Sequence, residues 1–187
     1  RIEDLHLSFQ GLAGTKFSMP RSLSFFDKTR DNDREIISGA NLVLQRGETL
    51  CIGGPSGQGK SALPRVIAGI ARPSAGKLYY FGEHIPPERQ TALEIAKRQV
   101  GLVFQNGALI SNLRVRDNIA LPLRYHKKGT AQEIEEKINM AMDLMRVRDF
   151  ANFFPHQLSV GMQKRVAIAR SWAMDPELLL MDEPTAG

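Results

Sequence analysis

Short apolar runs, separated by Gly, Pro and polar residues, dominate the N-terminal half of the chain and return near its end. Their length and their content of β-branched and aromatic residues are typical of β-strands. The predicted strands are residues 2–9, 23–26, 40–44, 49–52, 77–81, 100–104 and 177–181. Residues 49–52 are apolar on both faces, which predicts a strand buried in the middle of a parallel sheet. A hairpin is expected at Gly82, after residues 77–81.

The spacing of apolar residues becomes helical after Asn106. Thr130 and Glu133 have the spacing of a capping box, which predicts the start of a helix. One face of that helix should be a core-facing stripe of Ile134, Ile138, Ala141 and Met145. Further helices are expected at residues 61–70, at residues 90–97 and from about residue 161 to the Asp175-Pro176 pair. The pattern predicts an α/β fold with a mostly parallel sheet, into which residues 106–173 insert a helical lobe.

The composition narrows the class of protein. Among 187 residues, 42% are hydrophobic and 24% charged, which is ordinary for a folded soluble domain and excludes a disordered or fibrous chain. The net charge of +5 is dispersed, so no nucleic-acid partner is expected. No apolar run approaches the roughly 18 residues that span a bilayer. Cys51, the only cysteine, lies in a predicted strand and should be buried, without an intrachain disulfide.

Residues 54–61 read Gly-Pro-Ser-Gly-Gln-Gly-Lys-Ser and fit the phosphate-loop pattern G-x-x-x-x-G-K-[ST] between a predicted strand and a predicted helix. The predicted nucleotide contacts are Gly54, Pro55, Ser56, Gly57, Gln58, Gly59, Lys60, Ser61 and Ala62. Lys60 would bring a positive charge to the outer phosphates, and Ser61 a hydroxyl to Mg2+ at the positive end of a helix. The alternative interpretation is a Gly-rich turn before an ordinary helix.

Two carboxylates, Asp182 and Glu183, follow the last apolar strand. Ligands of open α/β sheets bind at the carboxyl ends of the strands, where these side chains are predicted to lie. Asp182 suits a Mg2+ site, and Glu183 suits activation of the water that attacks a γ-phosphate. A solvated acidic pair that closes a strand is the alternative.

The order of these motifs resembles ABC-type ATPase cassettes over nearly the whole chain. Leu158-Ser159-Val160-Gly161-Met162-Gln163 looks like the signature segment of that family, and residues 178–183 look like its Walker B strand. The resemblance implies that two cassettes pair head to tail, so that Ser159 and Gly161 of one contact the ATP held by the other. A plain N-cap is the alternative role of Ser159. Gln105 looks like the Q-loop glutamine, which implies catalytic and metal contacts.

The resemblance also implies an aromatic residue stacked on adenine. Phe26 is the candidate, with Phe25 and Phe9 as alternatives, and each could equally pack in a core. Ala62 and Pro64 depart from the family pattern at the start of the helix, and Pro64 cannot donate a hydrogen bond in its first turn. Val160 and Met162 depart from the usual signature.

The implied fold is a P-loop NTPase (RecA-like) with a mostly parallel core sheet, an N-terminal antiparallel β portion and the helical lobe. The whole chain, residues 1–187, would be a single cassette: residues 1–105 carry the β portion and Walker A core, residues 106–173 the helical subdomain, and residues 174–187 Walker B and the start of the D-loop. Because a switch histidine is expected beyond Walker B, the sequence is interpreted as a cassette truncated after that strand.

The implied function is an ATP-binding and ATP-hydrolysing subunit of an ABC transporter, with ATP and Mg2+ as cofactors. Its expected partners are a second cassette and a separate integral membrane permease, which would hold it at the cytoplasmic face of the membrane. Residues 104–109 and 117–123 look most similar to ATPases of Mla and Mce-type lipid transporters. The alternatives are a soluble ABC-type ATPase that acts on ribosomes or nucleic acid, and a catalytically silent interaction module.

Overall fold

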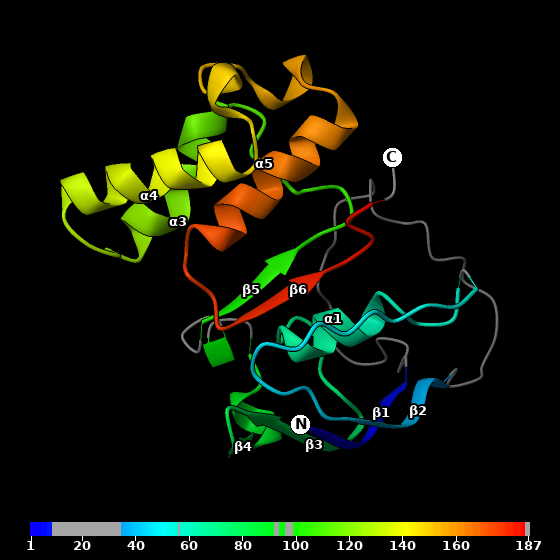
Figure 1. Ribbon diagram of the computed structural model, residues 1–187. Helices are drawn as coiled ribbons and strands as arrows, with labels where there is room; N and C mark the ends of the chain where they lie inside the picture. The colour runs from blue at the N-terminus through cyan, green and yellow to red at the C-terminus, as the bar shows by residue number, and fades with distance from the viewer. Residues whose placement is uncertain (9–34, 56, 92–93, 96–98, 186–187) are drawn as a thin grey trace, which may run out of the picture. The chain divides into compact units, whose positions relative to one another are not determined.

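The computed structural model describes residues 1–8, 35–55, 57–91, 94–95 and 99–185, and these form two compact units (Figure 1). The first unit comprises residues 1–63 and 72–87, and the second comprises residues 64–71 and 88–187. The predicted strand at residues 23–26, with Phe25 and Phe26, lies outside the described residues, as do Phe9 and Ser56. No helix among the described residues is long and apolar enough to cross a bilayer.

The first unit is built on a four-stranded antiparallel sheet in the order β2-β1-β3-β4. The strands are β1 (Ile2–Ser8), β2 (Glu35–Leu42), β3 (Ala75–Tyr80) and β4 (Glu83–Ile85). Alternation along β1 buries Leu5 and Leu7, and β3 buries Leu78 and Tyr80. This sheet is the antiparallel β portion expected from the sequence.

The connection between β3 and β4 confirms the predicted hairpin. Phe81 and Gly82 have φ angles of 52° and 85°, and Tyr80 pairs with Glu83 across them. Two consecutive residues with positive φ form the turn whose twist suits an antiparallel pair of strands. Gly82 adopts this conformation without a Cβ penalty, which explains its place in the sequence.

The prediction of a buried strand at residues 49–52 is wrong for the described chain. These residues have no strand structure, Leu50 is 47% exposed and Ile52 is 46% exposed. A strand requires backbone hydrogen bonds to a neighbour, and no strand among the described residues pairs with this segment. Cys51 is consequently exposed rather than buried, because the strand that would have covered it does not form.

Helix α1 spans Ala62–Ile67 and is shorter than the predicted helix over residues 61–70. Pro64 is accommodated in the first turn, where its missing N–H has no intrahelical acceptor, so the departure from the family pattern does not break the helix. The helix is closed at its C-terminus by hydrogen bonds from Gly69 N to Val66 O and from Ile70 N to Arg65 O.

The second unit contains a parallel pair of strands, β5 (Val100–Val103) and β6 (Leu178–Met181), in which Val103 lies opposite Met181. Figure 1 shows the two arrows side by side and pointing the same way. The apolar run before the two carboxylates predicts a buried strand, but Met181 is 40% exposed, so this strand is only partly covered. The reason is that β5 is its only neighbour among the described strands.

The helical lobe of this unit packs α3 (Val115–Tyr125), α4 (Ala131–Leu144) and α5 (Val160–Trp172) against one another, with 3-10 turns at Arg148–Phe150 and Pro155–Gln157 (Figure 1). A third 3-10 turn, Pro87–Arg89, spans the position in the sequence at which the first unit ends and the second continues. The core comprises Val115, Ile119, Ala120, Leu123, Ile138, Ala141, Met142, Val147, Leu158, Val166, Ala169 and Ala173. The predicted helix at residues 90–97 falls largely outside the described residues.

The start of α4 confirms the predicted capping box. Thr130 N donates to Glu133 Oε2 at 2.7 Å, and Glu133 N donates to Thr130 Oγ1 at 3.3 Å. The predicted stripe also faces the core, with Ile138 and Ala141 fully buried and the flanking Ile134 and Met145 packed against the same cluster.

Candidate functional site

The phosphate loop in the first unit adopts backbone conformations that require glycine. Gly54, Gly57 and Gly59 all have positive φ angles, of 149°, 82° and 77°. At Gly59 a Cβ would lie 2.5 Å from Ile36 Cγ2 and 2.9 Å from the Ile36 carbonyl oxygen, so β2 leaves no room for a side chain. The loop therefore depends on glycine at this position both for its conformation and for its packing.

Lys60 lies against the loop that precedes it. Its Nζ donates a hydrogen bond of 2.6 Å to the carbonyl oxygen of Pro55, which holds the ammonium group beside the backbone of the loop. The Ala62 N–H bonds to Gly59 O at 2.9 Å, so α1 begins immediately after Ser61. In a phosphate loop, backbone N–H groups and an ammonium group together suit a polyphosphate anion.

The carboxyl ends of β5 and β6 bring Gln105 and Glu183 together in the second unit. Gln105 Nε2 donates to Glu183 Oε2 at 2.5 Å, across 78 positions of sequence. Asp182, whose backbone N–H bonds to Val103 O at 3.0 Å, is only 7% exposed. The sequence pattern predicted that Asp182 and Glu183 lie at this edge, and the parallel register of β5 and β6 puts Gln105 beside them.

Glu183 has a constrained backbone. Its φ is 46°, in the left-handed region, and the following residue is Pro184. A non-glycine residue there costs on the order of 1–3 kcal/mol, and a following proline restricts it further. Such a conformation persists only where neighbouring groups hold it, and Lys164 is one of them, because its Nζ donates to the Glu183 carbonyl oxygen at 3.1 Å.

The segment after Gln105 is fastened to the lobe at two points. Arg170 donates to Ala108 O and Gly107 O, both at 2.9 Å, and its burial lowers the pKa of the guanidinium from the usual value. Asn118 is fully buried, accepts from Ile110 N at 2.8 Å and donates to Ile110 O at 3.1 Å. These bonds tie the loop to α3 and α5.

The signature residues lie on the surface of the second unit. Ser159 caps α5 by accepting a hydrogen bond from Met162 N at 3.3 Å, and Gln163 Nε2 bonds to Pro155 O and Leu158 O at 2.9 and 3.2 Å. Ser159 and Gly161 are exposed, and no atom lies within 4 Å of a Cβ built on Gly161. Ser159 is therefore the N-cap of α5, and the surface around Ser159 and Gly161 stays exposed.

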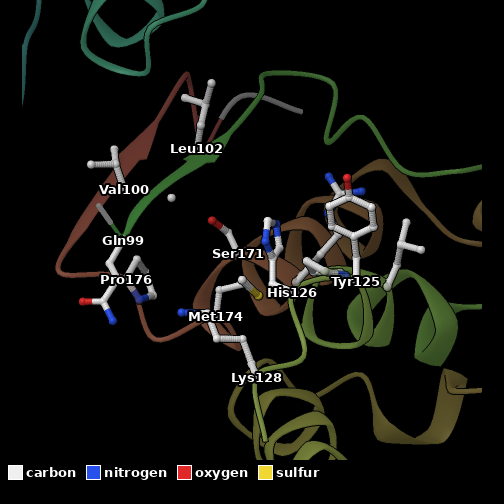
Figure 2. Close-up of a pocket in the computed structure, with 13 residues that line it drawn as sticks. Gln99, Val100, Leu102, Tyr125, His126, Lys128, Ser171, Met174 and Pro176 are labelled. Atoms are coloured by element: carbon white, nitrogen blue, oxygen red, sulfur yellow. The ribbon is translucent and has the colours of Figure 1, made fainter. Parts of the chain in front are cut away.

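Two grooves flank the parallel strands. One, of about 460 Å³, lies at the carboxyl end of β5 and is lined by Arg65, Phe104, Gln105, Asn106, Val160 and Lys164. The other, of about 440 Å³, lies at the amino end of β5 and beside the C-terminal ends of α3 and α5. Figure 2 shows Tyr125, His126, Met174 and Ser171 around this second groove. Because ligands of α/β sheets bind at the carboxyl ends, the first groove belongs to the candidate site and the second does not.

The predicted site residues therefore fall into three described groups: the phosphate loop, the Gln105 edge and the exposed start of α5. The loop belongs to the first unit and the other two groups belong to the second. Sequence reasoning missed Lys164, Arg170 and Asn118. The sequence feature that points to Lys164 is its spacing of three residues from Ala167, which places both on one helix face. In the structure that face is buried, and Lys164 is only 8% exposed.

The oxygen donors at the carboxyl edge suit Mg2+. No hydrogen bond to another described residue involves the nearly buried Asp182 carboxylate, which leaves both of its oxygens available to a hard cation. The Gln105 amide N–H is used by Glu183, so its carbonyl oxygen is the remaining ligand atom. Among the described residues, no group of three or more His, Cys, Asp or Glu side chains is placed to hold a metal ion.

Residues 37–186 match the family model described as ABC transporter. The intermembrane phospholipid transport system ATP-binding protein MlaF of Escherichia coli K12 is 37% identical over 167 residues, which cover 89% of this chain and 61% of MlaF. The cell division ATP-binding protein FtsE of the same organism is 39% identical over 152 residues, covering 81% of this chain and 68% of FtsE. This chain thus spans less than two thirds of the length of MlaF.

Solved structures give the same result. The dimeric post-hydrolysis structure of the ATP-binding cassette MJ0796, bound to ADP and Pi, superimposes with a TM-score of 0.79 at 27% identity, covering 98% of this chain and 73% of that one. CbiO1 from Clostridium perfringens, described as part of the ABC transporter complex cbiONQ, gives a TM-score of 0.74 at 28% identity, covering 100% of this chain and 65% of that one. These likenesses confirm the predicted α/β P-loop NTPase fold with its helical lobe.

Proposed function

The chain belongs to the ABC transporter family of ATP-binding proteins, and from this membership we propose that it binds and hydrolyses ATP to power transport through a separate membrane permease. The observation that carries the proposal is the hydrogen bond between Gln105 and Glu183 at the carboxyl edge of β5 and β6. This bond joins residues that follow two strands far apart in the sequence, at the edge of the sheet where α/β proteins bind their ligands.

The phosphate loop would hold the triphosphate through its N–H groups and Lys60, and the bond from Lys60 to Pro55 O would be exchanged for a phosphate oxygen. Ser61, Gln105 and Asp182 would hold Mg2+, which supplies neutralisation of the β- and γ-phosphate charge. Phe26 is proposed to stack on adenine, a role for which Phe25 and Phe9 are the alternatives.

Glu183 would act as the general base. Its carboxylate takes a proton from a water molecule while the water oxygen forms a bond to the γ-phosphorus. The bond from that phosphorus to the bridging oxygen breaks, and its electron pair stays on ADP. The amide of Gln105 orients the carboxylate through the Nε2 hydrogen bond, which leaves the second carboxylate oxygen for the water.

The second half of the site would come from another copy of the chain. Ser159 and Gly161 are exposed at the positive end of α5, where an anion held by a partner could approach. A dimeric structural relative supports this arrangement. We propose a single cassette in which residues 1–105 would carry the β portion and the Walker A core, residues 106–173 the helical subdomain with the signature, and residues 174–187 the Walker B strand and the start of the D-loop.

Similarity to MlaF suggests the transported class. We infer that the permease partner moves a phospholipid or a related lipid, and that the chain sits at the cytoplasmic face of the membrane through that partner. The alternative of a soluble ATPase that acts on ribosomes or nucleic acid gains no support, because the relatives found belong to transport and cell division systems.

The proposal is tested by phosphate release from Mg-ATP in the full-length protein and in Glu183→Gln. We expect turnover to fall at least about a hundredfold while ATP binding is kept, because the amide cannot accept the water proton. Glu177→Gln is the matched control, since Glu177 is exposed at the amino end of the same strand. Undiminished hydrolysis by Glu183→Gln would remove Glu183 from the mechanism.

A further inference from the structure

We propose that Lys164 is a positioning residue for the reaction, one that holds the backbone of Glu183 and ties it to the helix that begins at Ser159. This inference rests on the proposed function and adds a residue to it. Lys164 lies in the second turn of α5, and its Nζ donates to the Glu183 carbonyl oxygen at 3.1 Å across 19 positions of sequence.

The burial of Lys164 is the first argument. The residue is 8% exposed, although an ammonium group loses hydration when it leaves water. Its only hydrogen-bond acceptor among the described residues is the carbonyl of Glu183. An aliphatic side chain of similar length would fill the same space without that loss, so packing alone does not account for a lysine here.

The conformation of Glu183 is the second argument. With a φ of 46° before Pro184, its backbone needs an external restraint to stay in place. The carboxylate is held by Gln105 and the carbonyl by Lys164, so the residue is fixed from β5 at one end and from α5 at the other. Removing the contact with Lys164 would leave the carboxylate attached but free to turn with its backbone.

Helix α5 gives this contact a further consequence. The same helix carries Ser159 at its N-terminus and Arg170, which donates to the carbonyls of Gly107 and Ala108, two and three residues beyond Gln105. A displacement of α5 therefore shifts both the Glu183 backbone and the loop of Gln105. When a partner's nucleotide contacts Ser159, a shift of α5 would therefore move the backbone of the general base, Glu183, through its bond to Lys164.

The test compares Lys164→Met and Lys164→Arg with the unaltered full-length protein. We expect Lys164→Met to lower kcat about tenfold, which corresponds to about 1.4 kcal/mol, with KM for ATP changed less than about twofold. Lys164→Arg keeps a donor and should recover most of the turnover. Lys137→Met, a half-buried lysine of α4, is the control and should leave kcat unchanged.

Thermal unfolding separates a positioning role from a structural one. Lys164→Met should unfold at the same temperature as the unaltered protein or higher, because it no longer buries an ammonium group. An unchanged kcat would overturn the inference. So would a fall in unfolding temperature with a matching loss of ATP binding, because the role would then be structural. Retained turnover in Glu183→Gln is a different result, and it would overturn the proposed function itself.

Discussion

Asn118 offers a quantitative test of how the loop after Gln105 is held. The amide is fully buried, accepts a hydrogen bond from Ile110 N at 2.8 Å and donates to Ile110 O at 3.1 Å and to Leu113 O at 3.0 Å. Asn118→Ala removes these three bonds together with a longer one from Nδ2 to Arg114 O at 3.2 Å, which shares the two amide hydrogens. At about 1 kcal/mol each, the free energy of unfolding of the lobe should fall by about 3 kcal/mol.

Urea denaturation measures this change through Trp172, the only tryptophan, which packs against the lobe core. With a slope of about 2 kcal/mol per molar urea, the midpoint should fall by about 1.5 M. Asn139→Ala is the matched control, because the amide of Asn139 makes one bond of 3.3 Å to Glu135 on the same helix and should contribute less than about 0.5 kcal/mol. Equal midpoints for the two variants would refute the structural role of Asn118.

Two further predictions concern local geometry. Gly59→Ala should weaken ATP binding at least about tenfold in an equilibrium binding assay, because its Cβ would clash with Ile36. Gly82→Ala is the control and should bind ATP normally, because Gly82 has a similar φ but open space around it. At the start of α4, hydrogen bonds from the backbone and side chain of Thr130 lower the pKa of Glu133. This stabilisation is present above the ordinary pKa of a glutamate and is lost as the pH falls through the lower pKa of the folded state. Glu133→Ala should therefore unfold at a lower temperature than the unaltered protein at pH ~7. The difference between their unfolding temperatures should narrow below pH ~4. A difference that does not change with pH would contradict this assignment.

Local patterns were the features that the sequence predicted well. The capping box of Thr130 and Glu133 joins residues three positions apart, and the turn at Gly82 depends on neighbouring φ angles. The position of Asp182 and Glu183 at the end of a strand follows from one apolar run. Each of these rests on interactions within a few residues, which the linear pattern carries directly.

Contacts across the chain were the features that the sequence could not give. Lys164 meets Glu183 and Arg170 meets Gly107 only after α5 packs against the parallel strands, and no local pattern marks either pair. The error at residues 49–52 has the same origin. An apolar run predicts a strand, but a strand forms only when a neighbour supplies its hydrogen bonds, and Leu50 remains exposed.

We propose that one copy of this chain carries only part of each ATP site. Light scattering tests this by measuring the mass in solution of Glu183→Gln with Mg-ATP. We expect the mass to double on adding ATP, and Gly161→Glu in the same background to prevent doubling, because it places a carboxylate where the partner's phosphate should approach. A mass that stays the same with ATP, or doubles equally with Gly161→Glu, would contradict it.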